Sequence, residues 1–403
     1  MKKDNLKKLR EKIIIEEIDK LRYISINEKS VLLRLHNDPE IIMIIFQERL
    51  HDILNEYLNT PIILSNRKSV SSQSIEILFK YFQQEFNFKN ISINNLPELL
   101  VKGNILLETL INQYQYPFKK KDITVSKVFK ENYNFSKSLI NFFGFAKNFT
   151  HYANSFIVHG SCADLEITKF SDLDTFMIIK GNTVKSVQEL IDFKILWQRS
   201  LCYLYSFDCL QHHPHMFATE IDVLCFPYHW LPPQVFTESK SLFDNQVIHL
   251  NLYKNKVLIF RSFLQLAQRF RNPDILNKTY NEYTFKNDLS VISLFPTLLL
   301  QGINIDTTKK DSFQNTIVKE LDLDNIFETT SKIREEWNPS LISKLFISLR
   351  YSYIVKIIYL KFIIRKLKRN PLLLNSMFKE SFVIKLQRLI FRMSAHIITT
   401  NHE

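Results

Sequence analysis

Residues Phe156 to Ile179, FIVHGSCADLEITKFSDLDTFMII, carry the clearest structural pattern in this chain. Apolar runs of strand type open and close the stretch, and a polar loop joins them. Gly160 ends the first run in a chain with only 5 glycines, which indicates that the backbone needs glycine there. Asp172 and Asp174 precede the second run; on a strand they would share one face, roughly 6–7 Å apart. Two carboxylates so placed can share a pair of divalent cations.

The overall composition indicates a globular protein of more than one subdomain. The chain has 403 residues, of which 45% are hydrophobic, and this excludes a disordered chain. Its net charge of +12 is compatible with a polyanionic partner such as nucleic acid. The abundance of Lys, Asn, Ile and Phe also indicates a general compositional bias. We therefore favour basic residues spread over solvated surfaces, with room for a basic cleft that binds a nucleoside triphosphate.

The cysteines and the N-terminus bear on the expected compartment. The chain has 4 cysteines without paired spacing, which favours a reducing compartment over a disulfide scaffold. The N-terminal residues include Lys and Arg but no apolar segment of a secretory signal. No apolar run reaches the length of a membrane-spanning helix. The sequence therefore predicts a cytoplasmic protein without a membrane partner. The cysteines are Cys162, Cys202, Cys209 and Cys225.

The pattern around the central stretch predicts an α+β fold, with a small mixed sheet flanked by helical regions. We expect a helical N-terminal region over 1–133, the sheet domain over 134–235 and a helical C-terminal domain over 236–403. Lys119-Lys120-Lys121 is interpreted as a solvated connector. Helices are expected at 6–21, 40–58, 74–86, 96–114, 132–148, 184–205, 242–270 and 341–367. Strands are expected at 156–158, 174–179, 206–211 and 216–226.

Gly160-Ser161, followed after a polar loop by Ser171-Asp172-Leu173-Asp174, resembles the signature of the DNA polymerase β-like nucleotidyltransferase superfamily. The resemblance covers residues 134–226 and implies a metal-dependent transfer of a nucleoside monophosphate. It implies that Gly160 and Ser161 cradle the triphosphate, with Ser171 beside it. Asp172 and Asp174 would hold Mg²⁺ or Mn²⁺, because hard divalent cations prefer oxygen ligands. One ion would bridge the triphosphate and the other would activate the acceptor hydroxyl.

The superfamily places a third carboxylate on a later strand. Asp208, directly after the expected helix, is the favoured third catalytic and metal-binding residue. Asp222 shows the same apolar-Asp-apolar pattern one strand later and remains an alternative. Asp222 or Glu220 could instead accept the proton of the acceptor hydroxyl.

Two further polar segments are candidates for the site. The run Gln211-His212-His213-Pro214-His215 could bind a metal together with Cys209, but zinc ligands usually come as two separated pairs. We favour a polar hairpin at the rim of the cleft, where His213 would contact phosphate or acceptor; aminoglycoside nucleotidyltransferases are similar in having a histidine-containing turn. In the helical C-terminal domain, Lys310 could bind the triphosphate or could lie on a solvated turn.

The sequence thus predicts an enzyme that transfers AMP from ATP to an acceptor hydroxyl and releases pyrophosphate. A small molecule or a protein is favoured over RNA as acceptor, since no RNA-binding module is recognisable. The alternative is a catalytically inactive domain of the same fold that binds nucleic acid or a protein.

Overall fold

A computed structural model describes residues 39–59, 96–113, 118–208, 210–271, 282–338 and 380–402. The described residues form a mixed α+β structure, as the sequence predicts. The helices expected at 6–21, 74–86 and 341–367 lie outside the described residues, as does Cys209.

The described residues divide into two compact units. The first, which we call the sheet unit, comprises the described residues from Pro39 to Tyr253 together with Trp337 and Asn338. The second, the helical unit, comprises those from Lys254 to Glu336 and the C-terminal helix α21. The expected domain limits at 134 and 235 both fall inside the sheet unit.

The sheet unit contains a seven-stranded mixed sheet in the order β4-β3-β2-β6-β1-β7-β5. β2 runs antiparallel to β3, and β3 runs parallel to β4. The end of β2 and the starts of β3 and β4 therefore meet at one edge of the sheet. The strands are β1 Lys119–Lys127, β2 Ala153–Val158, β3 Thr175–Ile179, β4 Met216–Thr219, β5 Phe226–Pro227, β6 Lys240–Ser241 and β7 Gln246–Tyr253.

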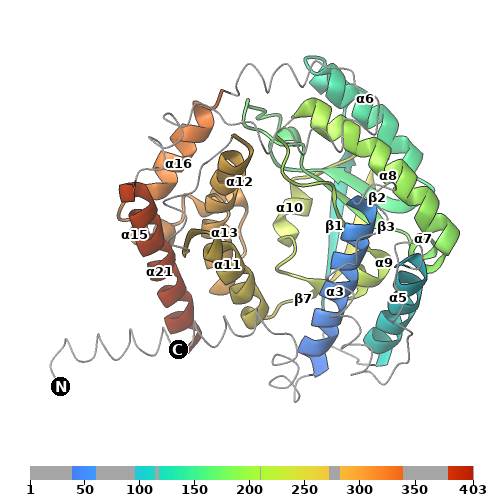
Figure 1. The fold of residues 1–403 in the computed structure, drawn as a ribbon, viewed down its shortest axis with the longest axis horizontal. Helices are drawn as coiled ribbons and strands as arrows, with labels where there is room; N and C mark the ends of the chain where they lie inside the picture. The colour runs from blue at the N-terminus through green and yellow to red at the C-terminus, as the bar shows by residue number, and fades with distance from the viewer. Residues whose placement is uncertain are drawn as a thin grey trace. The chain divides into compact units, whose positions relative to one another are not determined.

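Helices cover this sheet, and α6 lies side by side with α8 (Figure 1). The helices of the sheet unit are α3 Pro39–Asn59, α5 Leu96–Gln113, α6 Lys137–Ala146, α7 Gly181–Lys185, α8 Val187–Phe207, α9 Glu220–Leu224 and α10 Pro233–Thr237. The helical unit contains α11 Lys256–Arg271, α12 Glu282–Ile292, α13 Phe295–Gly302, α14 Lys309–Ser312, α15 Thr316–Leu321, α16 Ile326–Glu335 and α21 Glu380–His402. The helices expected at 40–58, 96–114, 132–148 and 184–205 are confirmed by α3, α5, α6 and α8.

Apolar side chains are buried on both faces of the sheet. The face toward α6 and α8 carries an aromatic cluster in which Phe156 contacts Phe142 and Phe149, with ring centroids 5.7 and 5.3 Å apart. Rings that meet edge to face in this way stabilise the packing beyond the area they bury. The opposite face is formed by Ile123, Val125, Ile157, Phe176, Ile178, Ala218, Ile248, Leu250 and Leu252.

Two strands of the sheet contradict the expected pattern. The segment Lys119-Lys120-Lys121 is not a connector, because it begins β1, which pairs with β7. The expectation of one helix over 242–270 is wrong in its first half, where β7 stands before α11. In β7, Ile248, Leu250 and Leu252 are buried and alternate with less buried residues. This period of two is that of a strand, although aliphatic residues allow a helix as well.

The expected strands at 206–211 and 216–226 also need correction. α8 continues through Phe207, and the backbone N–H of Asp208 donates to the carbonyl of Leu204 as the helix ends. Residues 216–226 form two short strands, β4 and β5, separated by α9. Thr219 and Asp222 form a capping box that begins α9, so that local hydrogen bonds override the strand pattern.

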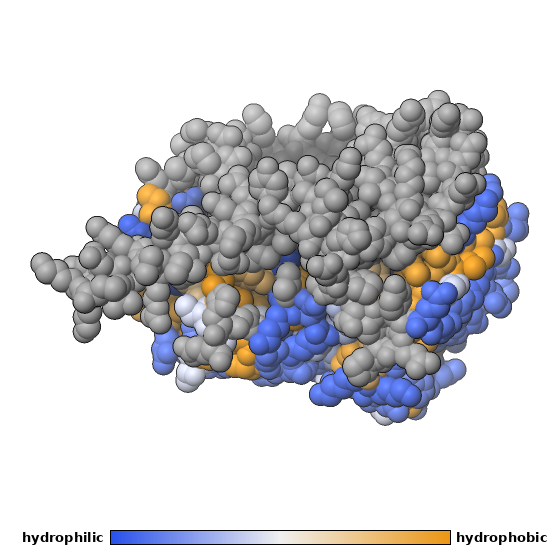
Figure 2. All heavy atoms as spheres, turned by 90° about the horizontal axis from the view of Figure 1, so that it is seen from below, coloured by the Kyte–Doolittle hydropathy of each residue, from blue (hydrophilic) through white to orange (hydrophobic). Residues whose placement is uncertain are grey.

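The described surface on the face shown in Figure 2 is a mosaic of small hydrophobic and hydrophilic patches. None of the helices in the described part of the chain combines the length and the hydropathy needed to cross a membrane.

Candidate functional site

Gly160 lies directly beyond β2, at the sheet edge where β3 and β4 begin. Its φ of +62° belongs to the left-handed region, which side chains other than glycine rarely adopt. A Cβ atom on this residue would lie 3.0 Å from Oδ2 of Asp174. Both the backbone conformation and the space therefore require glycine, and the close approach brings the Gly160 turn against an Asp174 carboxylate oxygen.

The backbone between the two aspartates is fixed from two sides. Gln211 is buried; its Oε1 accepts from the N–H of Leu173 over 2.9 Å and its Nε2 donates to the carbonyl of Leu173 over 3.2 Å. From β2, the N–H of His159 donates to the carbonyl of Asp174 over 3.0 Å. This backbone therefore has little freedom, and the carboxylates that project from it are preorganised.

A third connection reaches the same segment through Cys162. The hydroxyl of Tyr133 donates to the carbonyl of Cys162, and Sγ of Cys162 donates to the carbonyl of Asp172 over 3.6 Å. Burial raises the pKa of Tyr133 to about 12, and burial with the charges of Asp174 and Asp172 raises the pKa of the Cys162 thiol. Both groups therefore keep their protons and act as donors that position the loop.

Each aspartate faces a histidine. Nδ1 of His212 lies 3.1 Å from Oδ2 of Asp172, and Nε2 of His213 lies 2.9 Å from Oδ1 of Asp174. Asp172, His212 and His213 each offer a ligand atom, and these atoms all lie within 4.8 Å of one another. The side chain of Asp172 is only 9% exposed, so that water screens its charge poorly. This cluster is the group among the described residues that could hold a metal ion.

The Asp174–His213 pair carries opposite charges at neutral pH. Burial alone would raise the pKa of Asp174, but the hydrogen bond and charge of His213, with a contribution from His159, hold this pKa at about 2. Burial would lower the pKa of His213, but the hydrogen bond and charge of Asp174 raise it to about 9. Each charge therefore stabilises the other: Asp174 is ionised and His213 is protonated.

His159 is a further buried histidine at this edge. The β2–β3 register pairs Val158 with Thr175, so that His159 lies opposite Asp174 on the same face of the sheet. The residue is 7% exposed, and its Nε2 has no hydrogen-bond partner. Burial lowers the pKa of His159 to about 4, against the opposing charge of Asp174. His159 is therefore a neutral imidazole beside the cluster.

His215 has a different role. Its Nδ1 lies 2.7 Å from Oγ1 of Thr175, and its Nε2 lies 2.7 Å from Oγ of Ser200. Its ring stacks on Phe142, with centroids 5.7 Å apart. Both ring nitrogens are engaged in the core between β3 and α8, so that His215 supports the start of β4 and offers no ligand atom.

The other residues expected at the site occupy three different settings. Ser161 lies in the short 3₁₀ turn that begins at Gly160 and is half-buried. Oγ of Ser171 accepts from the N–H of Thr168 over 2.9 Å and stabilises the loop before Asp172. Lys310 lies exposed on α14 in the helical unit, and its contact with triphosphate stays a prediction.

Asp208 does not join the metal-binding cluster, although it lies in the described part of the chain. It is the C-cap residue of α8, and its Oδ1 accepts from the N–H of Leu210 over 3.0 Å. The carbonyl of Asp208 accepts from the N–H of Gln211 over 3.1 Å. Asp208 thus shapes the turn that presents Gln211 and the histidines.

Asp222 lies at the opposite end of the strands. Its Oδ2 accepts from the N–H and hydroxyl of Thr219, and its Oδ1 accepts from Nε2 of Gln47 over 2.9 Å. β3 and β4 are parallel, Asp172 precedes β3 and Asp222 follows β4, so the two are separated by about the length of β3, roughly 15 Å. Glu220 lies at the same far end, where it accepts from the N–H of Gly181. Neither acid reaches the cluster.

The histidines occupy the place beside the aspartates on the next strand. The β3–β4 register pairs Phe176 with Met216. Continued back along the chain, this register sets Pro214 beside Asp174 and His212 beside Asp172. The His-His-Pro segment therefore lies beside the two aspartates, on the neighbouring strand. The sequence alone favours a hairpin at the rim of the cleft for these histidines, because the register of two parallel strands is not visible in a sequence.

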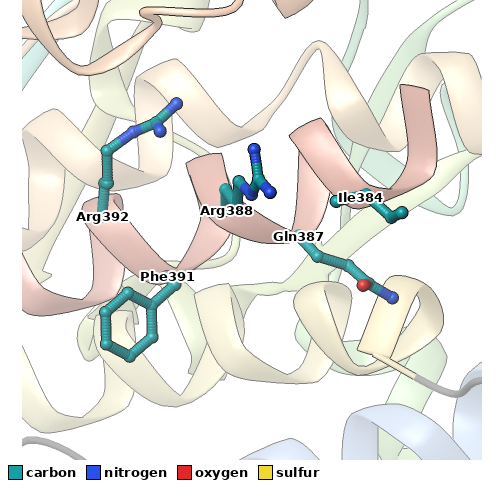
Figure 3. Close-up of a pocket in the computed structure, with 5 residues that line it drawn as sticks. All are labelled: Ile384, Gln387, Arg388, Phe391 and Arg392. Carbon is teal, nitrogen blue, oxygen red and sulfur yellow. The ribbon is translucent and has the colours of Figure 1, made fainter. Parts of the chain in front are cut away.

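The helical unit contains a shallow hollow along α21, lined by Ile384, Gln387, Arg388, Phe391 and Arg392 (Figure 3). Gln387 donates to the carbonyl of Phe270, and Arg392 donates to the carbonyl of Leu321. Gln387 and Arg392 thus connect α21 to α11 and to α15. The hollow contains no convergent set of catalytic groups among the residues that line it.

Comparison of the chain with family models, with curated proteins and with solved structures found no match. The functional conclusion therefore depends on the geometry of the Gly160 edge alone.

Proposed function

We propose that this chain is a metal-dependent nucleotidyltransferase with a polymerase β-like catalytic domain in its sheet unit. It transfers a nucleoside monophosphate, with ATP as the favoured donor, to an acceptor hydroxyl. The observation that carries the proposal is the approach of Gly160 to Asp174 at the edge where β2 ends and β3 begins. A glycine turn that passes this close to an acid of an Asp-x-Asp pair supports a phosphate site beside a metal site.

In the proposed reaction, the acceptor oxygen attacks the α-phosphorus of the nucleotide. A new bond forms between this oxygen and phosphorus, the bond to the bridging oxygen breaks, and pyrophosphate leaves with that electron pair. The proton of the acceptor hydroxyl passes to solvent water. The bound divalent cation would supply charge neutralisation and lower the pKa of the acceptor hydroxyl. Asp172 and Asp174 would hold it, while the Gly160–Ser161 turn orients the triphosphate.

The backbone connections to the aspartates support this role. Gln211, His159 and Cys162 fix the segment that carries both acids. Transfer of a phosphoryl group depends mainly on positioning and electrostatic stabilisation, so that a preorganised pair of carboxylates is the central requirement. A small molecule or a protein remains the favoured acceptor.

One observation favours the alternative of a catalytically inactive binding domain. Asp208 and Asp222 both stand outside the cluster, so that no third carboxylate completes it among the described residues. An inactive domain would bind a nucleotide or a partner without releasing pyrophosphate. Turnover separates the two functions directly.

The first test measures pyrophosphate release from each of the four common NTPs, with Mg²⁺ or Mn²⁺ and a metabolite and protein extract as the source of acceptor. We expect metal-dependent release that falls by more than about 1000-fold in the Asp172→Asn/Asp174→Asn double variant, because a dicarboxylate that holds the metal cannot be replaced by amides. Asp122→Asn, on the exposed β1 surface, is the matched control and should retain wild-type release.

Binding of an NTP without release of pyrophosphate, under every metal and acceptor condition, would support the inactive domain. Release that persists in the double variant would show that another site carries the activity.

A further inference from the structure

The cluster beside Gly160 contains nitrogen as well as oxygen ligands. Asp172, His212 and His213 present a carboxylate oxygen and two imidazole nitrogens within 4.8 Å of one another. Mg²⁺ prefers oxygen ligands and several retained waters, whereas imidazole suits transition metals such as Fe²⁺ and Zn²⁺, and the affinity of a mixed nitrogen and oxygen site rises from Mn²⁺ through Fe²⁺ to Co²⁺. The ligand types therefore distinguish between two kinds of divalent cation.

The hydrogen bond of His213 to its own turn determines which ring nitrogen is available. Nδ1 of His213 lies 2.9 Å from the carbonyl oxygen of Pro214. A carbonyl only accepts, so that Nδ1 carries a proton and donates it, and Nε2 faces Asp174 over 2.9 Å. A backbone carbonyl in this position commonly fixes the tautomer of a metal-binding histidine.

The spacing of the atoms suits one ion. Ligand atoms around a four-coordinate transition metal lie about 3.3 Å apart when each is about 2.0–2.1 Å from the ion. Oδ2 of Asp172 and Nδ1 of His212 lie 3.1 Å apart, and the ligand atoms of Asp172, His212 and His213 all lie within 4.8 Å of one another. The rings of His212 and His213 meet at 89° with centroids 4.7 Å apart, so that adjacent residues present nitrogens from different directions. Small shifts would open the cluster around a cation.

A second, independent observation is the buried imidazole of His159. Its Nε2 has no hydrogen-bond partner, the residue is 7% exposed, and it lies opposite Asp174 on the same face of the sheet. A buried polar atom without a partner is costly, and a ligand or an ordered water would satisfy it.

We propose that Asp172, His212 and His213, supported by Asp174, form a binding site for a single divalent transition-metal ion that discriminates against Mg²⁺. This proposal refines the metal requirement of the proposed nucleotidyltransferase, on which its functional meaning rests. The ion lies among the ligand atoms of Asp172, His212 and His213. Mn²⁺ is then the ion that both fits the mixed ligand set and supports nucleotidyl transfer.

The test uses the full chain after removal of metals with a chelator, and titrates Mn²⁺, Co²⁺ and Mg²⁺ separately by calorimetry without nucleotide. We expect one Mn²⁺ or Co²⁺ per chain, bound at least about 100-fold more tightly than Mg²⁺. Co²⁺ should show visible absorption bands from nitrogen ligation. In His213→Asn the affinity for Co²⁺ should fall by more than about 100-fold, since loss of a supporting contact alone costs about 10- to 100-fold.

His212→Asn provides a second variant at another of the three proposed ligands, and its folding is checked by circular dichroism. His249→Asn is the matched control, because His249 lies exposed on β7 with Asp122 as its acidic neighbour. Its Co²⁺ affinity and absorption should equal those of the wild type. Mg²⁺ binding as tight as that of Mn²⁺, or unchanged Co²⁺ affinity in both folded histidine variants, would overturn the proposal.

The two proposals fail separately. Tight Co²⁺ and Mn²⁺ binding without pyrophosphate release from any NTP would support the metal site and contradict the nucleotidyltransferase activity. Pyrophosphate release with Mg²⁺ that is unaffected by His212→Asn and His213→Asn would support the activity and contradict the mixed-ligand site.

Discussion

At the scale of single residues, Gly160 has the strongest structural requirement in the candidate site. The positive φ of Gly160 and the 3.0 Å approach to Asp174 are independent reasons for glycine. Gly144, in the middle of α6, has neither: a Cβ on that residue would meet nothing within 4 Å. The structure therefore requires glycine at position 160 but not at position 144.

Gly160→Ala should destabilise the protein by about 1–2 kcal/mol, because alanine is disfavoured in the left-handed region and its methyl group would press on Asp174. Gly144→Ala should stabilise it by up to about 1 kcal/mol, since alanine is the better helix former. Urea unfolding measures both changes. Equal effects of the two substitutions would contradict the role assigned to the Gly160 turn.

At the scale of elements, the turn between α8 and β4 organises the site. It contains Asp208, Gln211 and both histidines of the cluster. Gln211 connects this turn to the start of β3 by two hydrogen bonds to Leu173. The turn therefore sets the distance between the histidines and the aspartates.

Gln211→Leu should reduce the affinity for Co²⁺ by about 10- to 100-fold, because the aspartate segment loses the amide that positions it. The free energy of unfolding should fall by about 1–3 kcal/mol, since the N–H and C=O of Leu173 remain buried without partners. Calorimetry and urea unfolding measure the two effects. Gln188→Leu, exposed on α8, is the control; a loss of stability in Gln211→Leu without a change in metal affinity would limit Gln211 to a purely structural role.

At the scale of the whole molecule, the sheet unit is larger than the segment that contains the motif. β1 lies between β6 and β7, so that strands from both sides of the expected catalytic domain complete one sheet. α3 is also attached to it: Asn59 accepts from Nε1 of Trp197 over 3.1 Å, and Glu48 lies 2.7 Å from Nε2 of His229. Stability should therefore be a property of the sheet unit and not of residues 134–235 alone.

The buried histidines predict how this stability depends on pH. Burial, with the charge of His213, lowers the pKa of His215 to about 3, against 6.5 for an ordinary histidine. Below pH 6.5, His215 therefore binds a proton in the unfolded chain but not in the folded chain. Because of this difference, His215 lowers the free energy of unfolding by about 1 kcal/mol for each pH unit of acidification. His213 contributes a smaller change of the opposite sign near pH 6.5, because its raised pKa keeps it protonated in the folded chain while the unfolded chain is only partly protonated there.

Urea unfolding at pH 6.5 and pH 5.5, with the wild type and His215→Gln, checks this sign. The wild type should lose about 1 kcal/mol more than the variant across this interval. Both proteins retain the contribution of His159, whose pKa is also lowered. An identical loss in the two proteins would mean that His215 is not the neutral buried group described above.

The local sequence predicted the elements whose pattern is unambiguous. β2 and β3 follow from apolar strand-forming runs, and α3, α5, α6 and α8 follow from helical spacing. Gly160, Asp172 and Asp174 were identified because glycine scarcity and the i, i+2 spacing are properties of adjacent residues. β1 and β7 were missed, because a lysine-rich edge and a run of aliphatic residues fit more than one structure.

Local residue patterns thus predicted the α+β class and the glycine turn with its neighbouring pair of aspartates. The residues that complete the cluster are visible only in the folded chain. The parallel register of β3 and β4 sets His212 and His213 beside Asp172 and Asp174. Asp208 caps the end of α8 and Asp222 belongs to the capping box of α9, so that neither acid lies in the cluster. The reason is physical: strand register depends on hydrogen bonds between residues far apart in the chain, which no local pattern of residue types encodes. The end of α8 and the capping box are local hydrogen bonds that compete with a strand pattern compatible with the same residues.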